Sequence, residues 1–165
     1  MKFQSILKEK FNNLFQRENI YFLLLILIIF FLDRLSKDSI IKNFNEHVLF
    51  VNNYVNIDLV WNNGIGFGLL ISNSPLFYNL ITLIIGIVIL ILIYIFTISE
   101  KIDKFIFSII IGGALGNFSD RIMYKAVPDF IDLHYFNFHW FTFNVADIFI
   151  TLGITIFLTK GLIVK

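Results

Sequence analysis

Four long apolar stretches, separated by more polar segments, dominate the chain. The plainest of them, 76–98, contains no charged residue. The other three, 18–38, 104–123 and 141–160, carry their few charges mostly towards their ends. A helix needs roughly 20 mostly apolar residues to cross the hydrocarbon core of a bilayer. The pattern therefore predicts four transmembrane helices at these positions.

The first stretch is preceded by basic residues, as the apolar core of a cleavable signal peptide is. No small-residue cleavage site of the A-x-A kind follows it, and the apolar run continues into Asp33 and Arg34. It is therefore interpreted as an uncleaved first span.

The composition supports a membrane protein of one domain. The 165 residues are 58% hydrophobic and only 15% charged, whereas soluble domains have about 45–50% apolar and about 25% charged residues. The excess of apolar surface has to face lipid. A net charge of +1 gives no basic field for nucleic acid, and the absence of cysteine excludes disulfides, thiolate metal sites and a cysteine nucleophile.

Lysine and arginine are distributed unevenly between the two sides of the predicted bundle. The side that carries both termini has eight of them: Lys2, Lys8, Lys10, Arg17, Lys101, Lys104, Lys160 and Lys165. The opposite side has only Lys42 and Lys125. Because basic loops stay in the cytoplasm, both termini are predicted to be cytoplasmic, with 39–75 and 124–140 outside.

The longer outer segment, 39–75, is predicted to contain short strands. Between Val48 and Leu59, apolar and aromatic residues lie among Asn and Asp, with a turn signal at Asn52 and Asn53. The expected fold is thus an all-α integral membrane protein, a four-helix transmembrane bundle with a small extracytoplasmic β element.

Ionisable residues occur inside three of the predicted spans, where they are costly and are candidates for function. With alternating span directions, Asp33 and Lys37, Asp120, and Asp147 all come to the outer end of the bundle. Asp33 and Lys37 are four residues apart and could instead form a purely structural ion pair within one helix.

Asp120 and Asp147 are the predicted catalytic residues. Two carboxylates close together in a low dielectric share a proton, so that one can act as an acid and the other as a base. This is the arrangement with which aspartic peptidases activate water.

Other chemistries fit the sequence less well. It has no G-x-S-x-G and no H-E-x-x-H motif. His134 and His139, with Asp129 and Asp132, could in principle bind a metal, but a solvated loop is the favoured interpretation, and no metal or cofactor is predicted. The alternative function is a small proton-coupled transporter that uses the paired intramembrane carboxylates. Transporters usually place their site near the midplane and contain repeats, whereas these carboxylates gather at one face and no repeat is present.

Five runs of residues, taken in order, resemble the motifs of the lipoprotein signal peptidase (signal peptidase II) family. They are 33–37 (DRLSK), 62–68 (NNGIGFG), 112–121 (GGALGNFSDR), 127–130 (VPDF) and 143–147 (FNVAD). The resemblance implies a multi-pass enzyme of the bacterial cytoplasmic (inner) membrane. Such an enzyme removes the signal peptide from diacylglyceryl-modified prolipoproteins, cutting before the lipidated cysteine, at an active site near the outer face.

The resemblance also implies roles for individual residues. The catalytic pair maps onto Asp120 and Asp147. The residues that bind substrate or shape the site are Asp33, Lys37, Asn62, Gly64, Asn117, Arg121, Asn144 and Ala146. The implied partners are lipid-modified prolipoproteins and membrane lipids, with no nucleic acid, and the protein is expected to be a monomer. Independently of the resemblance, the glycines and apolar residues of 62–68 predict that this segment clamps over the bound peptide; the alternative is that it only braces the first two spans.

Overall fold

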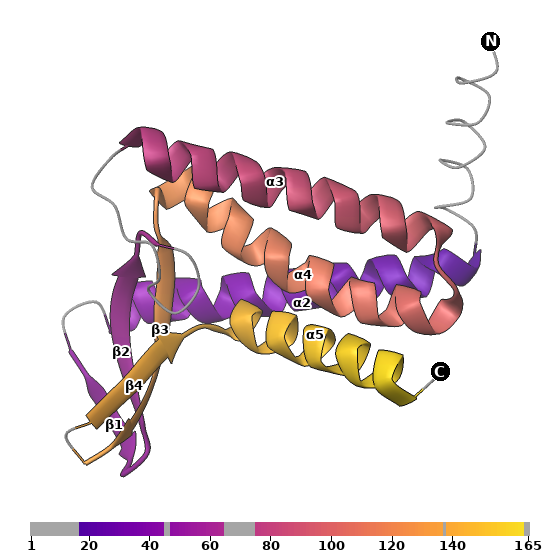
Figure 1. Ribbon diagram of the computed structural model, residues 1–165. Coiled ribbons are helices and arrows are strands. Elements are labelled where there is room, and N and C mark those ends of the chain that lie inside the picture. The colour runs from indigo at the N-terminus through magenta and orange to yellow at the C-terminus, as the bar shows by residue number, and fades with distance from the viewer. Residues whose placement is uncertain (1–16, 45–46, 65–74, 137, 164–165) are drawn as a thin grey trace.

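The computed structural model describes residues 17–44, 47–64, 75–136 and 138–163, and it contains a helical bundle with a small sheet at one end (Figure 1). The helices are α2 (Arg17–Asn43), α3 (Pro75–Ile98), α4 (Lys101–Tyr124) and α5 (Val145–Ile163). All four are long and apolar enough to cross a membrane. The predicted fold class is confirmed.

Helix α4 lies at the centre of the bundle and contacts α2, α3 and α5. Glycines on α4 allow its neighbours to approach closely, as small residues do in membrane bundles. A Cβ at Gly113 would collide with the carbonyl oxygen of Ala146 on α5, and a Cβ at Gly116 would collide with the carboxylate of Asp33 on α2. The glycine-rich run therefore brings the polar residues of three helices together.

The outward faces of the helices are apolar. Leu83 and Leu90 on α3 are 60% and 67% exposed, and Leu158 on α5 is 60% exposed. Such surface would be unfavourable in water, but it is what a helix presents to lipid. The apolar residues thus meet lipid, and the helix–helix contacts hold the polar groups.

The sheet has four antiparallel strands in the order β1-β2-β3-β4. They are β1 (Leu49–Asn52), β2 (Val55–Asn62), β3 (Val127–Tyr135) and β4 (Phe138–Phe143). The predicted strands with a turn after Asn52 are confirmed, and the Asn52 side chain accepts hydrogen bonds from the backbone of Tyr54 and Val55. The other two strands, in the second outer segment, were not predicted.

The start of the last helix differs from the prediction. Residues 141–143 belong to strand β4, and α5 begins at Val145. The apolar residues Phe141 and Phe143 extended the hydrophobic pattern across a strand–helix junction, so hydropathy alone could not locate it. Asn144 is the residue between the two elements, and its side chain accepts a hydrogen bond from the Asp147 backbone at 3.0 Å, which caps the helix.

Candidate active site

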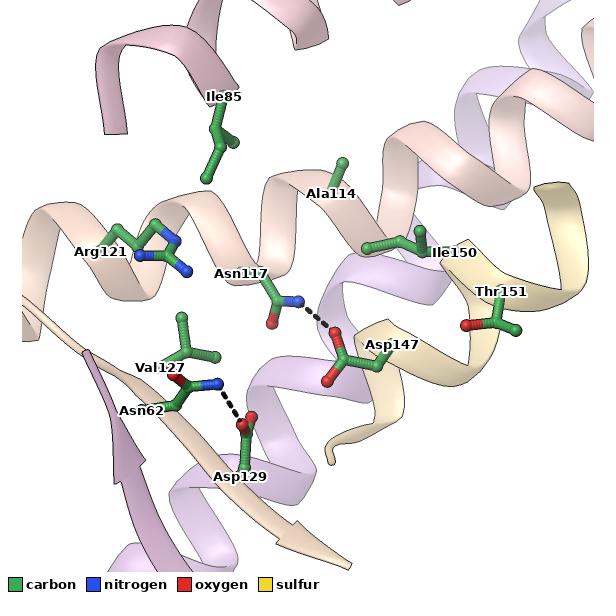
Figure 2. Close-up of a pocket in the computed structure, with 10 residues that line it drawn as sticks. All are labelled: Asn62, Ile85, Ala114, Asn117, Arg121, Val127, Asp129, Asp147, Ile150 and Thr151. Carbon is green, nitrogen blue, oxygen red and sulfur yellow. Dashed lines mark hydrogen bonds between the residues drawn. The ribbon is translucent and has the colours of Figure 1, made fainter. Parts of the chain in front are cut away.

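A pocket of about 270 Å³ lies where the sheet meets α3, α4 and α5 (Figure 2). Its lining residues are Asn62, Ile85, Ala114, Asn117, Arg121, Val127, Asp129, Asp147, Ile150 and Thr151. The polar members come from two strands and two helices and point towards one another, whereas Ile85, Ala114 and Ile150 form an apolar side. We call this the carboxylate pocket, because it holds Asp129 and Asp147.

Asp129, on strand β3, is almost fully buried at 2% exposure. Its two carboxylate oxygens accept hydrogen bonds from the side-chain amides of Asn62 at 2.8 Å and Asn144 at 2.6 Å. Burial, and then the negative charge of Asp147, raise the pKa of Asp129 to about 7, although the two amides oppose the shift. At neutral pH this carboxyl group can therefore either hold or release a proton.

Asp147, in the first turn of α5, is the second acid of the pocket. Its carboxylate accepts a hydrogen bond from the Asn117 amide at 2.8 Å and another from the Asn144 backbone at 3.2 Å. The Asn144 side-chain amide also binds Asp129. Asn144 therefore holds both acids, and it does so from the short junction between β4 and α5.

Asp120 lies elsewhere, and the predicted pairing of Asp120 with Asp147 needs revision. Its carboxylate accepts a hydrogen bond from Lys37 at 2.7 Å and forms a second ion pair with Arg34. The side chain is fully buried and is not among those lining the carboxylate pocket. The prediction rested on depth in the membrane, but depth does not specify a helix face, and Asp120 points towards α2.

Lys37 is the centre of this second polar group. Its ammonium donates hydrogen bonds to Asp33 at 2.7 Å, to the Asn117 side-chain oxygen at 2.8 Å and to Asp120 at 2.7 Å. The ion pair between Asp33 and Lys37, which the sequence left as one possibility, is thus present. We call Asp33, Arg34, Lys37 and Asp120 the ion-pair cluster. Arg34 was not among the predicted site residues.

Asn117 joins the ion-pair cluster to the carboxylate pocket. Since the Lys37 ammonium can only donate, it binds the Asn117 oxygen, which turns the amide nitrogen towards Asp147 (Figure 2). The backbone nitrogen of Ala146 donates to Asp33 at 2.9 Å and anchors the start of α5 to α2. Asp147 is therefore positioned directly by Asn117 and indirectly by Asp33, Lys37 and Ala146.

Arg121 has one terminal nitrogen occupied and one available. Its Nη2 donates to the backbone oxygen of Gly64 at 2.5 Å. Its Nη1 is buried and has no hydrogen-bond partner among the described residues, although the side chain lines the pocket. A buried donor without a partner is costly, so this nitrogen offers a binding site for an oxygen atom that enters the pocket.

The remaining sequence predictions lie outside the pocket. His139 is 2.8 Å from Asp132, and no cluster of three potential metal ligands occurs within the part of the chain that the structure describes. Of the predicted clamp, 62–68, residues 65–68 lie outside the described residues. Gly64 is buried and hydrogen-bonded to Asn62 and Arg121.

Asp129 is the residue that sequence reasoning missed: it was weighed as a possible metal ligand and it lies in the motif 127–130, but it was given no catalytic role. A signal was available: Asp129 is the single charge in the apolar run from Ala126 to Ile131. An acid in such a run is typical of a carboxyl group that faces a buried polar site.

The helical bundle with its small sheet is similar to known structures of bacterial membrane enzymes. Two structures of such enzymes, determined by the in meso method at 2.3 Å and 1.9 Å resolution, superpose with TM-scores of 0.73 and 0.72. The first is 29% identical and the second 26%, and they cover 86% and 88% of this chain and 87% and 94% of their own.

Sequence comparison identifies the family. The profile of signal peptidase (SPase) II matches residues 25–163. A lipoprotein signal peptidase of Pelagibacter ubique is 46% identical over 135 residues, 80% of this chain and 81% of its own. One from Blochmanniella pennsylvanica is 42% identical over 151 residues, 88% of this chain and 90% of its own. The chain belongs to the signal peptidase II family, which makes it a protease of lipoprotein processing.

Proposed function

We propose that this protein is an aspartic endopeptidase in which Asp129 and Asp147 activate a water molecule. Membership of the signal peptidase II family supports the removal of signal peptides from prolipoproteins. In this proposal the substrate carries a diacylglyceryl group on a cysteine and is cut just before that cysteine. The observation that carries the dyad is that these two acids share a pocket and one asparagine, while Asp120 is occupied by two cations.

The two acids have different roles in the proposed reaction. Asp147 enters ionised and removes a proton from water, whose oxygen attacks the carbonyl carbon of the scissile bond. Asp129 enters protonated, because its pKa of about 7 keeps a proton available near neutral pH, and donates that proton to the carbonyl oxygen. The proton that Asp147 took then passes to the leaving nitrogen as the C–N bond breaks, and one hydroxyl of the tetrahedral intermediate returns its proton to Asp129 as the new carboxyl group forms.

The other polar residues of the pocket bind and orient. Nη1 of Arg121 donates to a carbonyl oxygen of the bound peptide, since it has no other partner among the described residues. Asn62 and Asn144 hold Asp129, and Asn117 holds Asp147. The side-chain oxygen of Asn62 also accepts a hydrogen bond from the Gly64 backbone at 2.8 Å, which connects the start of the proposed clamp, 62–68, to Asp129.

The membrane arrangement is part of the same proposal. The protein acts as a monomer among membrane lipids, both termini are cytoplasmic, and the sheet and pocket lie at the outer face. A reporter that works only outside the membrane should give signal when fused at Asn53, between β1 and β2, and none at Lys101, the first residue of α4. The reverse pattern would place the site on the cytoplasmic side.

The dyad is tested by replacing each acid with its isosteric amide. Asp129→Asn and Asp147→Asn should each lower cleavage of a lipidated precursor by at least about 100-fold, while the thermal melt in detergent persists. Asp120→Asn is the matched comparison: it should mainly lower the melting temperature, because the positive charges of Lys37 and Arg34 lose their partner. A well-folded Asp120→Asn protein without activity, beside an active Asp129→Asn protein, would restore Asp120 to the dyad.

A further inference from the structure

A second hollow lies beside the carboxylate pocket and has a different character. Its volume is about 420 Å³, and its walls are helix α5 on one side and the sheet on the other. Ile148, Leu152 and Thr155 line it from α5, and Leu133, Phe141 and Phe143 line it from β3 and β4. We call it the apolar groove. Among the described residues that line it, Asp147 alone is charged.

The two hollows share a boundary on α5. Asp147 and Thr151 line both of them, and being four residues apart they lie on one face of the helix. Ile150 faces only the carboxylate pocket, and Leu152 faces only the groove. A substrate that crosses this boundary places its reacting bond over Asp147, with one part of the molecule on each side.

The chemistry of the groove indicates which part of the substrate it receives. Apart from Asp147, it presents aliphatic and aromatic side chains and two threonines, so it offers little to a peptide backbone, which must satisfy its N–H and C=O groups. From Ile148 to Thr155 it follows α5 for about 10 Å along the predicted span. Ile148 and Leu152 are 44% and 47% exposed, so a hydrocarbon chain can enter sideways from the bilayer.

We infer that the apolar groove binds one acyl chain of the lipid carried by the substrate, while the carboxylate pocket receives the peptide. This inference rests on the proposed function, because it requires a lipidated substrate. It makes Leu152 and its neighbours determinants of chain-length specificity. The lipid then has two effects: it anchors the substrate in the membrane, and it aligns the scissile bond with Asp147.

The test uses two synthetic lipopeptides that differ only in acyl length, one with long and one with short chains. Leu152→Trp fills the groove, and Ile154→Trp, on the same helix but outside both hollows, is the control. Displacing roughly two methylene groups from apolar contact corresponds to about a tenfold loss. Leu152→Trp should therefore lower kcat/KM for the long-chain peptide about tenfold and change the short-chain value by less than about twofold. The control variant, Ile154→Trp, should cleave both peptides like wild type.

A second measurement does not depend on the activity of the Trp variant. A long-chain lipopeptide with a photoreactive diazirine at the acyl terminus is crosslinked to full-length Asp129→Asn protein, and the sites are located by fragment mass spectrometry. Crosslinks at Leu133, Leu152 or Thr155 support the groove. Crosslinks confined to α3 would overturn it. An equal fall in kcat/KM for both peptides in Leu152→Trp would overturn it as well. If wild type cleaves neither peptide, the proposed function fails, whereas cleavage of both that is insensitive to Leu152→Trp refutes the groove alone.

Discussion

The ion-pair cluster and the carboxylate pocket contain similar residues but are built in opposite ways. In the cluster, two acids meet two cations, and the ammonium of Lys37 has all three of its protons engaged. In the pocket, the two acids accept from amide and backbone donors, and Nη1 of Arg121 has no partner within the part of the chain that the structure describes. A buried charge that is paired with its counter-charge thus holds helices together, whereas a buried acid without a paired cation remains available for proton transfer.

The largest expected effect comes from removing the cation at the centre of the cluster. Lys37→Met keeps the length of the side chain but leaves Asp33 and Asp120 without their shared partner. Breaking a buried ion pair by removing one member costs about 3–5 kcal/mol. The free energy of unfolding in detergent should fall by about that amount.

Lys42→Met, at an exposed position on the same helix, is the control and should melt like wild type. A Lys37→Met protein as stable as wild type would show that the cluster is not what holds α2 to α4.

The next effect is a pH dependence that comes from Asp129 in the carboxylate pocket. The pKa of Asp129 is about 7 in the folded protein and 3.8 in its ordinary state, so the folded state binds the extra proton between these values. The free energy of unfolding should therefore decrease by a few kcal/mol as the pH rises from about 4 to about 7. The cleavage rate should fall above about pH 7, because the proposed acid loses its proton.

Replacing Asp129 with Asn should flatten this pH dependence of stability, measured as melting temperature across the pH range. Asp58→Asn, on strand β2, serves as the control and should retain the wild-type slope. An unchanged slope in Asp129→Asn would mean that another group carries the proton.

The smallest expected change in stability is at the link between the two regions. Asn117→Asp still offers an oxygen to Lys37, so the cluster should survive. The free energy of unfolding should fall by no more than the worth of the one charged hydrogen bond that is lost, about 1.5–3 kcal/mol. Because the donor that faced Asp147 becomes a carboxylate, kcat should fall by about 10- to 100-fold. Full activity in a protein with Asn117→Asp would show that Asp147 does not need this donor.

The fold was largely predictable from the sequence, because lipid imposes a simple rule on helices. Runs such as 76–98 are long and uninterrupted, and the helix found, Pro75–Ile98, agrees within one residue. Strands β3 and β4 were missed because Pro128, the aromatic residues and the two histidines obscure the period of two. Nothing in hydropathy separates the end of a buried strand from the start of an apolar helix, and so the start of α5 was misplaced.

The candidate site was predictable as a set of residues but not as a set of pairs. The polar interior contains several of the residues that the sequence singled out: Lys37, Asn62, Asn117, Arg121 and Asn144. Which acid faces Asp147 depends on the rotation of α4 about its own axis, and the sequence does not state that rotation. In the structure, Gly116 faces α2, because a Cβ at this position would collide with Asp33. Asp120, four residues further along α4, lies on the same face and therefore also points towards α2.

The hydrogen bonds of Asn144 connect the beginning of α5 to the acids. Asn144 and Asp147 cap one another, with Asn144 accepting from the Asp147 backbone and Asp147 accepting from the Asn144 backbone. This reciprocal pattern normally only keeps a first helical turn from fraying. Here the side-chain amide of the same Asn144 reaches Asp129. Unwinding of the first turn of α5 would therefore break the hydrogen bonds that hold the two acids in place. The active site would then be lost even though the helical bundle remained folded.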